Sequence, residues 1–227
     1  MGSPRGEGLY VDEPDHVVWL SAFCIDRLET TDALYSACVT AGACSPEPLS
    51  YPGTGPDYPI PHLHFEDAVA FCAWSGKAAP SEAQWEKAAR GGCEIVPPPT
   101  CGPEDERPYP WGDSPPTCDK ANFALDPDRP WEGCVGSYDV VGRRPAGASP
   151  YGALDMAGNR RELVNDTWSE HDYELCGDPC IDPRHEGPGE RQITRGGNYH
   201  EGASDIVVTR RMLQEHNSGT VRCALDL

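Results

Sequence analysis

The chain has 227 residues, 24 glycines and 24 prolines, so it is long enough to bury a core but is rich in turns. Its net charge is −19, with 37 acidic and 18 basic side chains, which excludes a basic surface of the kind that binds nucleic-acid phosphates. No apolar run approaches the ~20 residues that cross a bilayer, so we expect no transmembrane segment.

Residues 1–15 are rich in glycine and acidic side chains, and we expect them to be flexible. No linker is visible beyond them, which predicts a single domain over residues 16–227. Partial alternation of apolar residues from Val17 to Ile25 predicts a strand. Thr31 is a suitable N-cap for a following helix, which Gly42 would end.

Two further helices are predicted. Apolar residues from Phe65 to Cys72 recur at the i, i+3, i+4 and i+7 positions, and Gly76 would end that helix. Ser81 and Gln84 have the spacing of a capping box, and Gly91 would end the helix that they start.

The remaining chain has weaker signals. Residues 93–150 show little periodicity, which predicts a long loop region held by disulfides. Residues 193–195 and 206–209 are the best later strands, and residues 221–225 close the chain.

Eleven cysteines are unusual in a cytosolic protein of this size and indicate disulfides. Short spacings suggest local bridges, although the sequence alone leaves the connectivity open. The suggested pairs are Cys38 with Cys44, Cys93 with Cys101, Cys118 with Cys134, and Cys176 with Cys180. We therefore expect an extracytoplasmic protein (secreted, periplasmic or attached to a surface) whose signal sequence has been removed.

Three stretches carry a family resemblance. They are HFEDAVAFCAWSGKAAPSEAQWEKAARGG at 64–92; YPWGD at 109–113, with AN at 121–122 and SPYGALDMAGN at 149–159; and RGG at 195–197 with VRCA at 221–224. Together they resemble the formylglycine-generating enzyme family, also called sulfatase-modifying factors.

The resemblance implies an α+β fold that is irregular and loop-rich, a variant of the C-type-lectin-like fold with two packed helices and a small twisted antiparallel sheet. It also implies bound calcium and a disulfide between Cys72 and Cys223, which would leave Cys24 as the odd thiol.

Family members that make formylglycine use two cysteines just after the Gly-Gly pair to bind copper(I). In this chain the matching positions fall on Glu201 and on or beside Ile206. Because copper(I) requires soft thiolate ligands, we expect neither copper nor formylglycine generation. The stretch Arg160-Arg161-Glu162-Leu163 also stands where the family usually has a Trp-Glu-Trp type of sequence, which puts the family's peptide substrate in doubt.

Asn159 and Glu162 are the first candidate calcium ligands, since the resemblance places Glu162 at a calcium-ligand position and calcium prefers hard oxygen ligands. Their spacing would also fit an N-cap and capping box at the start of a helix. A second calcium site would use Asn122. Its expected acidic partner matches Gly133, although Glu132 or Asp128 could substitute.

The sequence holds candidate ligands for two other metals. His171, Cys176, Cys180 and His185 are spaced symmetrically, as in a zinc knuckle, but a local disulfide between the cysteines fits the chain better.

An iron site would draw on histidines and one carboxylate, as in some sulfoxide-forming relatives. The candidates are His62, His64, His200, Glu201 and His216. Those relatives take their ligands from an additional helical domain, so iron is the weaker interpretation.

The candidate ligand-binding set mixes aromatic, amide and charged side chains, as recognition surfaces do. It comprises Asn198, Tyr199, His200, Glu201, Arg210, Arg211 and Asn217. The alternative is that these are ordinary polar loop residues.

The first functional hypothesis is a non-catalytic module that binds a protein, peptide or small-molecule ligand. The second is an enzyme with a different, metal-dependent oxidative chemistry that uses His200 and Glu201. The third is a variable-loop receptor.

Overall fold

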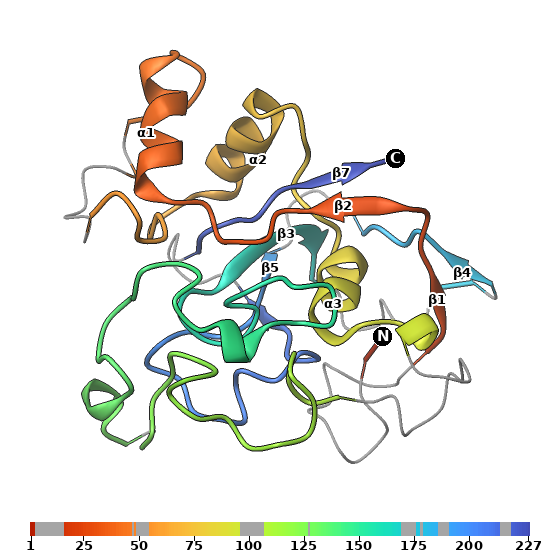
Figure 1. Ribbon diagram of the computed structural model, residues 1–227. Helices are drawn as coiled ribbons and strands as arrows, with labels where there is room; N and C mark the ends of the chain where they lie inside the picture. Colours follow the sequence, from red (N-terminus) through yellow and green to blue (C-terminus); the bar gives the residue numbers. More distant parts are fainter. Residues whose placement is uncertain are drawn as a thin grey trace.

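The computed structural model describes residues 1–2, 16–46, 48, 55–95, 107–126, 128–168, 176–177, 179–185, 191–213 and 219–227. The predicted flexible segment 1–15 therefore lies almost wholly outside the described residues. The helices and strands are β1 (Val18–Trp19), β2 (Phe23–Ile25), α1 (Asp32–Thr40), α2 (Phe65–Trp74), α3 (Glu82–Arg90), β3 (Glu162–Thr167), β4 (Cys180–Ile181), β5 (Gln192–Arg195), β6 (Met212–Leu213) and β7 (Ala224–Asp226). The fold is the predicted mixture of helices and small, mainly antiparallel sheets, joined by long loops (Figure 1).

α1 and α2 are the two packed helices, and they lie side by side at one end of the molecule (Figure 1). The backbone N–H of Leu34 donates to Thr31 Oγ1 at 3.3 Å, which confirms the predicted N-cap of α1. The Tyr35 and Phe71 rings meet across the helix pair with centroids 5.9 Å apart. Both rings are buried in an apolar cluster that also contains Cys72.

α3 packs against the central sheet, through β3 and β5, and against β2. Ser81 and Gln84 form the predicted capping box, with bonds of 3.1 Å and 2.9 Å between side chain and backbone. Trp85 on this helix is fully buried beside Met156 and Ile193. α3 therefore supplies one wall of the second core.

The predicted strand from Val17 to Ile25 divides into two short strands with different partners. β1 pairs in parallel with β4, while β2 pairs antiparallel with the C-terminal strand β7. Ser21 lies between the two strands, and its backbone N–H and its hydroxyl both donate to the Asp182 carboxylate at 2.7 Å.

The central sheet has the order β3-β5-β6 and is antiparallel, with Glu162 opposite Arg195. The predicted helix start at Asn159 and Glu162 is therefore wrong, and with it the capping-box interpretation. Asn159 has a φ of 58°, which is outside the helical region, and Glu162 begins β3.

The predicted strand at 206–209 is also wrong. Ile206 and Val208 are buried, but the segment forms bends and turns. The carbonyl oxygens of Val208 and Thr209 accept bonds from the Arg195 guanidinium instead of from a neighbouring strand.

The described cysteines largely confirm the expected bridges. Disulfides join Cys38 to Cys44, Cys118 to Cys134, Cys176 to Cys180 and Cys72 to Cys223. Cys93 is also in a disulfide, although Cys101 lies outside the described residues. Cys24 is the free cysteine of the described part of the chain and is exposed.

Candidate functional site

Two adjacent glycines turn the chain after β5. Gly196 and Gly197 have φ angles of +85° and +75°, which glycine adopts without strain. A Cβ at Gly197 would lie 2.7 Å from the Ile206 side chain, and one at Gly196 would lie 3.2 Å from the Trp85 ring. Glycine at both positions therefore allows residues 198–201 to follow a turn that is pressed against the core.

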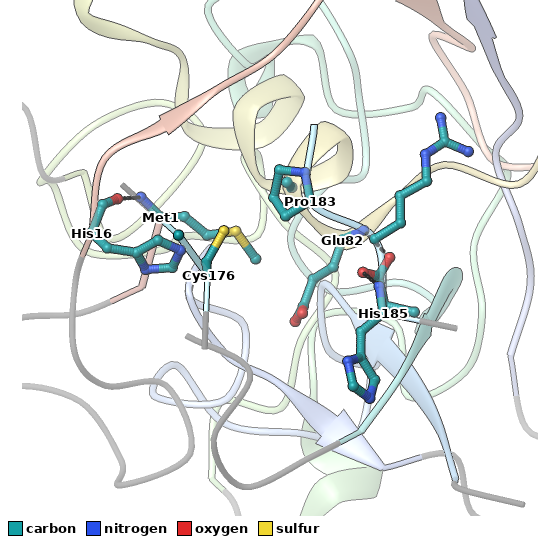
Figure 2. A pocket seen from close by; sticks show the side chains of 10 residues that line it. Met1, His16, Glu82, Cys176, Pro183 and His185 are labelled. Atoms are coloured by element: carbon teal, nitrogen blue, oxygen red, sulfur yellow. Dashed lines mark hydrogen bonds between the residues drawn. The ribbon is translucent and has the colours of Figure 1, made fainter. Parts of the chain in front are cut away.

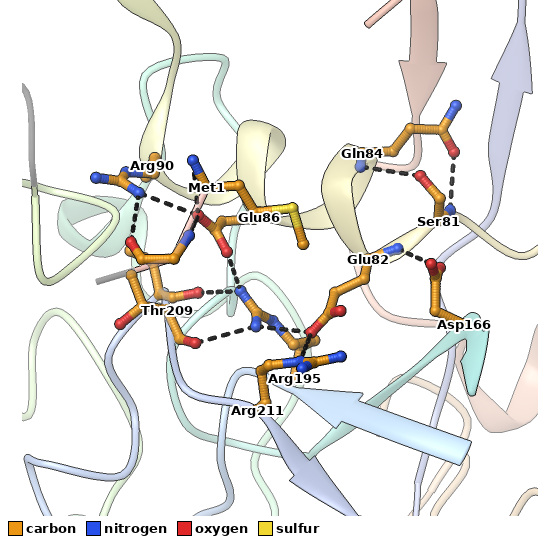
Figure 3. A network of polar contacts seen from close by, with 12 residues as sticks. Met1, Ser81, Glu82, Gln84, Glu86, Arg90, Asp166, Arg195, Thr209 and Arg211 are labelled. Carbon is orange, nitrogen blue, oxygen red and sulfur yellow. Dashed lines mark hydrogen bonds and ion pairs between the residues drawn. The ribbon is translucent and has the colours of Figure 1, made fainter. Parts of the chain in front are cut away.

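Arg195 fixes this turn to α3 through a buried ionic network (Figure 3). Its guanidinium lies 3.0 Å from Glu82 Oε1 and 2.6 Å from Glu86 Oε2, and it also donates to the Thr209 carbonyl at 3.1 Å. Arg211 Nε donates to the same Glu82 oxygen at 2.8 Å. Because buried charges must be paired, this network positions the turn more rigidly than apolar contact alone would.

Residues 198 and 199 are held by the segment that precedes β3. The Tyr199 backbone N–H lies 3.0 Å from the Asn159 carbonyl and 2.8 Å from Asn198 Oδ1. The Tyr199 ring meets Tyr138 and His200 edge-to-face, with centroids 5.0 Å apart in both cases. Burial raises the pKa of Tyr199, so its phenol is protonated at neutral pH.

Arg160 packs against this aromatic group through Tyr138. It is 3% exposed, and its guanidinium lies 4.9 Å from the centroid of the Tyr138 ring, in cation–π range. It also donates to the Tyr138 hydroxyl at 3.1 Å and to the Pro61 carbonyl. The cation is thus fixed and contributes positive potential near the site.

Glu201 forms an ion pair with Arg161 beside the exposed His200. Partial burial lowers the pKa of His200; Glu201 opposes this shift, whereas Arg161 and Arg160 add to it. The imidazole is therefore neutral at pH 7 and can both donate and accept a hydrogen bond. Together these groups form a polar, aromatic site of mixed charge.

The structure brings together only part of the predicted ligand-binding set. Asn198, Tyr199, His200 and Glu201 are consecutive on the turn. Arg211 is buried and belongs to the Glu82 network, and Arg210 pairs with Asp205 at 3.5 Å. Asn217 lies outside the described residues.

Both positions expected for the catalytic cysteines are occupied by groups with other roles. Glu201 pairs with Arg161, and Ile206 is fully buried in an apolar cluster with Phe123 and Ala157. Cys223 is bonded to Cys72. None of these residues offers a thiolate to copper(I).

The expected calcium ligands are already hydrogen-bonded to protein groups. Glu162 accepts bonds of 2.6 Å from Arg222 at both carboxylate oxygens, and Trp85 Nε1 donates to it at 2.7 Å. Asn159 Oδ1 accepts from Asn122 Nδ2 at 3.1 Å and from the Asp139 backbone at 2.9 Å. Asn159 and Glu162 therefore do not fit a calcium ion in this arrangement.

Asn122 Oδ1 is a buried oxygen without a hydrogen-bond partner, which does fit a hard cation. Asn159, which contacts Asn122 Nδ2, donates to Glu29 Oε2 at 2.7 Å, and the buried carboxylates of Asp155 and Glu162 interact electrostatically with Glu29. Burial, Asp155 and Glu162 hold the pKa of Glu29 well above its usual range, whereas Arg222 opposes them. This region thus carries an excess of buried carboxylate groups.

The described residues do not gather the other expected metal ligands. No group of three His, Cys, Asp or Glu side chains in the described ranges is placed to hold a metal ion. Cys176 and Cys180 are joined to each other, as the disulfide interpretation predicted. His171 and His216, which the zinc and iron sites required, lie outside the described residues.

A separate pocket of about 300 Å³ lies beside the start of α3 (Figure 2). His16, Glu82, Asp166 and His185 contribute polar side chains to its lining, which includes none of residues 198–201. Asp166 accepts bonds from the backbone N–H groups of Glu82 and His185 at 2.7 Å and 3.0 Å. Burial, together with Glu82, raises its pKa to about 7.

Sequence reasoning missed Tyr138, and it treated Arg160 and Arg161 only as departures from a family pattern. Tyr138 lies in the long loop region, where no periodicity identifies a site residue. The available signal was the departure itself, since two adjacent arginines stand in the stretch that otherwise resembles the family.

No helix within the described ranges is long and apolar enough to cross a membrane.

Comparison with known proteins identifies similar chains. The family model described as "Sulfatase-modifying factor enzyme 1-like domain" matches residues 1–225. Formylglycine-generating enzyme from Thermomonospora curvata is 33% identical over 190 residues, which cover 75% of this chain and 56% of that protein. Hercynine oxygenase from Mycolicibacterium thermoresistibile is 30% identical over 232 residues, which cover 86% of this chain and 48% of that protein.

A bovine relative, "Inactive C-alpha-formylglycine-generating enzyme 2", is 31% identical over 163 residues, which cover 66% of this chain and 48% of that protein. The chain thus spans about half the length of these curated relatives. Among solved structures, PvdO from Pseudomonas aeruginosa has a similar fold, with a TM-score of 0.73 at 21% identity. The match covers 100% of this chain and 90% of the PvdO chain. At that identity the likeness concerns the fold alone.

Proposed function

Because the chain belongs to the sulfatase-modifying factor family, which includes the formylglycine-generating enzymes, we propose that it is a non-catalytic member that acts as an extracytoplasmic binding module. Its ligand is a protein, peptide or small molecule, and the recognition surface centres on Asn198, Tyr199, His200 and Glu201.

One feature carries this proposal: the family resemblance places the copper-binding cysteines of active members at Glu201 and on or beside Ile206, and here Glu201 is paired with Arg161 while Ile206 is buried. A carboxylate is a hard ligand and an isoleucine side chain cannot ligate, so neither supports copper(I) chemistry. The remaining groups are suited to recognition, since the Gly196 turn and the Arg195 network present them on a rigid support.

Two further observations support the proposed setting. The described disulfides favour an oxidising compartment outside the cytoplasm. The neutral His200 imidazole beside the Arg161–Glu201 pair offers hydrogen bonds of both kinds to a polar ligand.

Turnover of a Cys-x-Pro-x-Arg peptide tests the proposal. The protein, supplied with copper and oxygen, should leave the peptide cysteine unchanged by mass spectrometry. A formylglycine-generating enzyme assayed in parallel shows that the conditions permit turnover. Conversion of the cysteine to formylglycine by this chain would overturn the proposal.

The second candidate function is metal-dependent oxidation that uses His200 and Glu201. Two observations favour it: the hercynine oxygenase relative, and the adjacency of one imidazole and one carboxylate at the site. Against it, Glu201 is engaged by Arg161, and a histidine with one carboxylate provides fewer ligands than a two-histidine, one-carboxylate iron site.

We also propose calcium as a stabilising ion near Asn122. The unpartnered Asn122 Oδ1 and the excess of buried carboxylates around Arg222 support this placement. Glu162 would contribute through the local potential, since its oxygens are bonded to Arg222.

A further inference from the structure

One loop of the protein exposes three large apolar side chains. It comprises residues 118–136, and the Cys118–Cys134 disulfide closes all of it except the last two residues. Within it Leu125 is 60% exposed, Trp131 69% and Val135 48%. A tryptophan this exposed forgoes the stabilisation that burial of its large ring would give, and several exposed apolar side chains in one loop indicate an interaction site.

The backbone around these side chains is held firmly. The Cys134 backbone N–H donates to the Phe123 carbonyl at 3.0 Å, and the Ala124 N–H donates to the Glu201 carbonyl at 2.8 Å. A Cβ at Gly133 would lie only 2.7 Å from the Phe123 carbonyl oxygen, so the two branches of the loop touch. The apolar side chains are therefore exposed by a fixed backbone, which lowers the entropy cost of binding a partner.

The same loop is acidic. Its four acidic side chains, at positions 119, 126, 128 and 132, outnumber the two basic side chains of Lys120 and Arg129, which leaves a net charge of −2. Arg129 lies 2.9 Å from Asp126 Oδ2 and 2.7 Å from Glu132 Oε2, so it bridges two of the carboxylates along the loop. Trp131 lies between Arg129 and Glu132 in sequence, on the 3₁₀ turn Pro130–Glu132 that appears in green at the edge of Figure 1.

We propose that this loop is a docking site for a basic segment of a partner protein, which places a Lys or Arg side chain on Trp131 and apolar side chains against Leu125 and Val135. The face of a tryptophan ring attracts a cation, and the adjacent carboxylates strengthen that attraction. A net charge of −19 over the whole chain steers basic partners toward it and repels acidic ones. The docking loop goes beyond the proposed function, because its side chains are distinct from residues 198–201.

A random-peptide library displayed on phage tests the inference, because such a library samples basic, acidic and apolar segments alike. Selection uses the full chain, and enriched peptides are then measured against variants by fluorescence anisotropy. W131A removes the anchor, and W19A is the matched control, since Trp19 is 63% exposed on β1. A loss of peptide affinity in H200A would show that the peptide binds at residues 198–201 and not at the loop.

Enriched peptides should combine Lys or Arg with apolar residues and bind W131A about tenfold or more weakly, as expected for a tryptophan hot spot. W19A and H200A should bind them as the unchanged chain does, and added salt should weaken the binding. The double variant D128N/E132Q, which preserves the ring, should also bind them more weakly. Each variant's thermal midpoint is compared with that of the unchanged chain, to show that the variant is folded. If W131A is unfolded, the peptide affinity of D128N/E132Q tests the inference in its place.

Three outcomes of the selection and of the W131A measurement would overturn the inference. They are enrichment of peptides without basic residues, equal binding to W131A and the unchanged chain, and failure to enrich any peptide. Peptides that lose affinity with H200A but not with W131A would also overturn it, while supporting the proposed function at residues 198–201.

Discussion

Arg222 and Glu162 form a two-bonded ion pair in the centre of the protein, with both contacts at 2.6 Å and neither side chain exposed to solvent. Arg222 also donates to the backbone carbonyls of Asp26, Arg27 and Leu154. One guanidinium thus joins the segment after β2, the start of β3 and the segment before β7.

Removal of this cation should be strongly destabilising. R222A leaves the Glu162 carboxylate buried without its partner, so we expect a loss of about 3–5 kcal/mol in the free energy of unfolding, measured with urea. R184A is the control, because Arg184 pairs with Asp226 at the surface and its loss should change stability by less than about 1 kcal/mol. Similar losses in the two variants would contradict the structural role given to Arg222.

The Cys72–Cys223 disulfide should be the most stabilising of the described bridges, since it closes a sequence separation of 151 residues. Replacing both cysteines with alanine should cost about 5 kcal/mol in the chain-entropy model, against about 2 kcal/mol for Cys38 and Cys44. Thermal unfolding of the two double variants measures the difference. A larger loss for the Cys38–Cys44 variant would show that native packing, rather than loop length, sets the order.

Asp166 should make stability depend on pH. Its pKa is raised to about 7 when folded, so between its unfolded value and 7 the folded state holds a proton that the unfolded state releases. The contribution of Asp166 to the free energy of unfolding is therefore highest at acid pH and decreases as the pH rises toward 7. D166N should remove that slope, which is at most about 1.4 kcal/mol per pH unit.

Urea unfolding at several pH values between 4 and 8 measures the pH dependence of stability that Asp166 should cause. The difference in stability between the unchanged chain and D166N isolates Asp166 from Glu29, whose raised pKa acts in the same direction. A difference that is constant across the range would show that Asp166 does not titrate there.

Calcium should raise the thermal midpoint relative to EDTA, because a cation near Asn122 offsets the buried carboxylates. N122A should lose the calcium-dependent part of the shift. The surface variant D119N is the control, since Asp119 is exposed. Equal midpoints in calcium and EDTA would overturn the proposed ion.

Local signals in the sequence predicted the helices well. The Thr31 cap, the Ser81 capping box and Gly42 each act within a few residues, so their geometry follows from neighbouring residue types. The family resemblance, rather than spacing, supplied the Cys72–Cys223 bridge that joins distant segments.

Long-range pairing explains what the sequence did not predict. Glu162 has the spacing of a capping residue, but strand pairing with Arg195 and the bonds from Arg222 place it at the start of β3. The apolar run Ile206-Val207-Val208 favours a strand, yet the Val208 carbonyl accepts a hydrogen bond from the Arg195 side chain instead of from a neighbouring strand. The sequence alone predicted residues 198–201 of the site, which are consecutive. It did not predict Tyr138, whose ring contacts Tyr199 from a loop without periodicity.

The metal content of the purified protein tests the central claim most directly. The protein is loaded separately with copper(I) under anaerobic conditions and with iron(II), freed of unbound metal, and measured by mass spectrometry, with H200A and E201A in parallel. A non-catalytic binding module should retain neither metal stoichiometrically, and the variants should match the unchanged chain. About one equivalent of copper or iron, lost in H200A or E201A, would contradict the account and identify a metal-dependent enzyme.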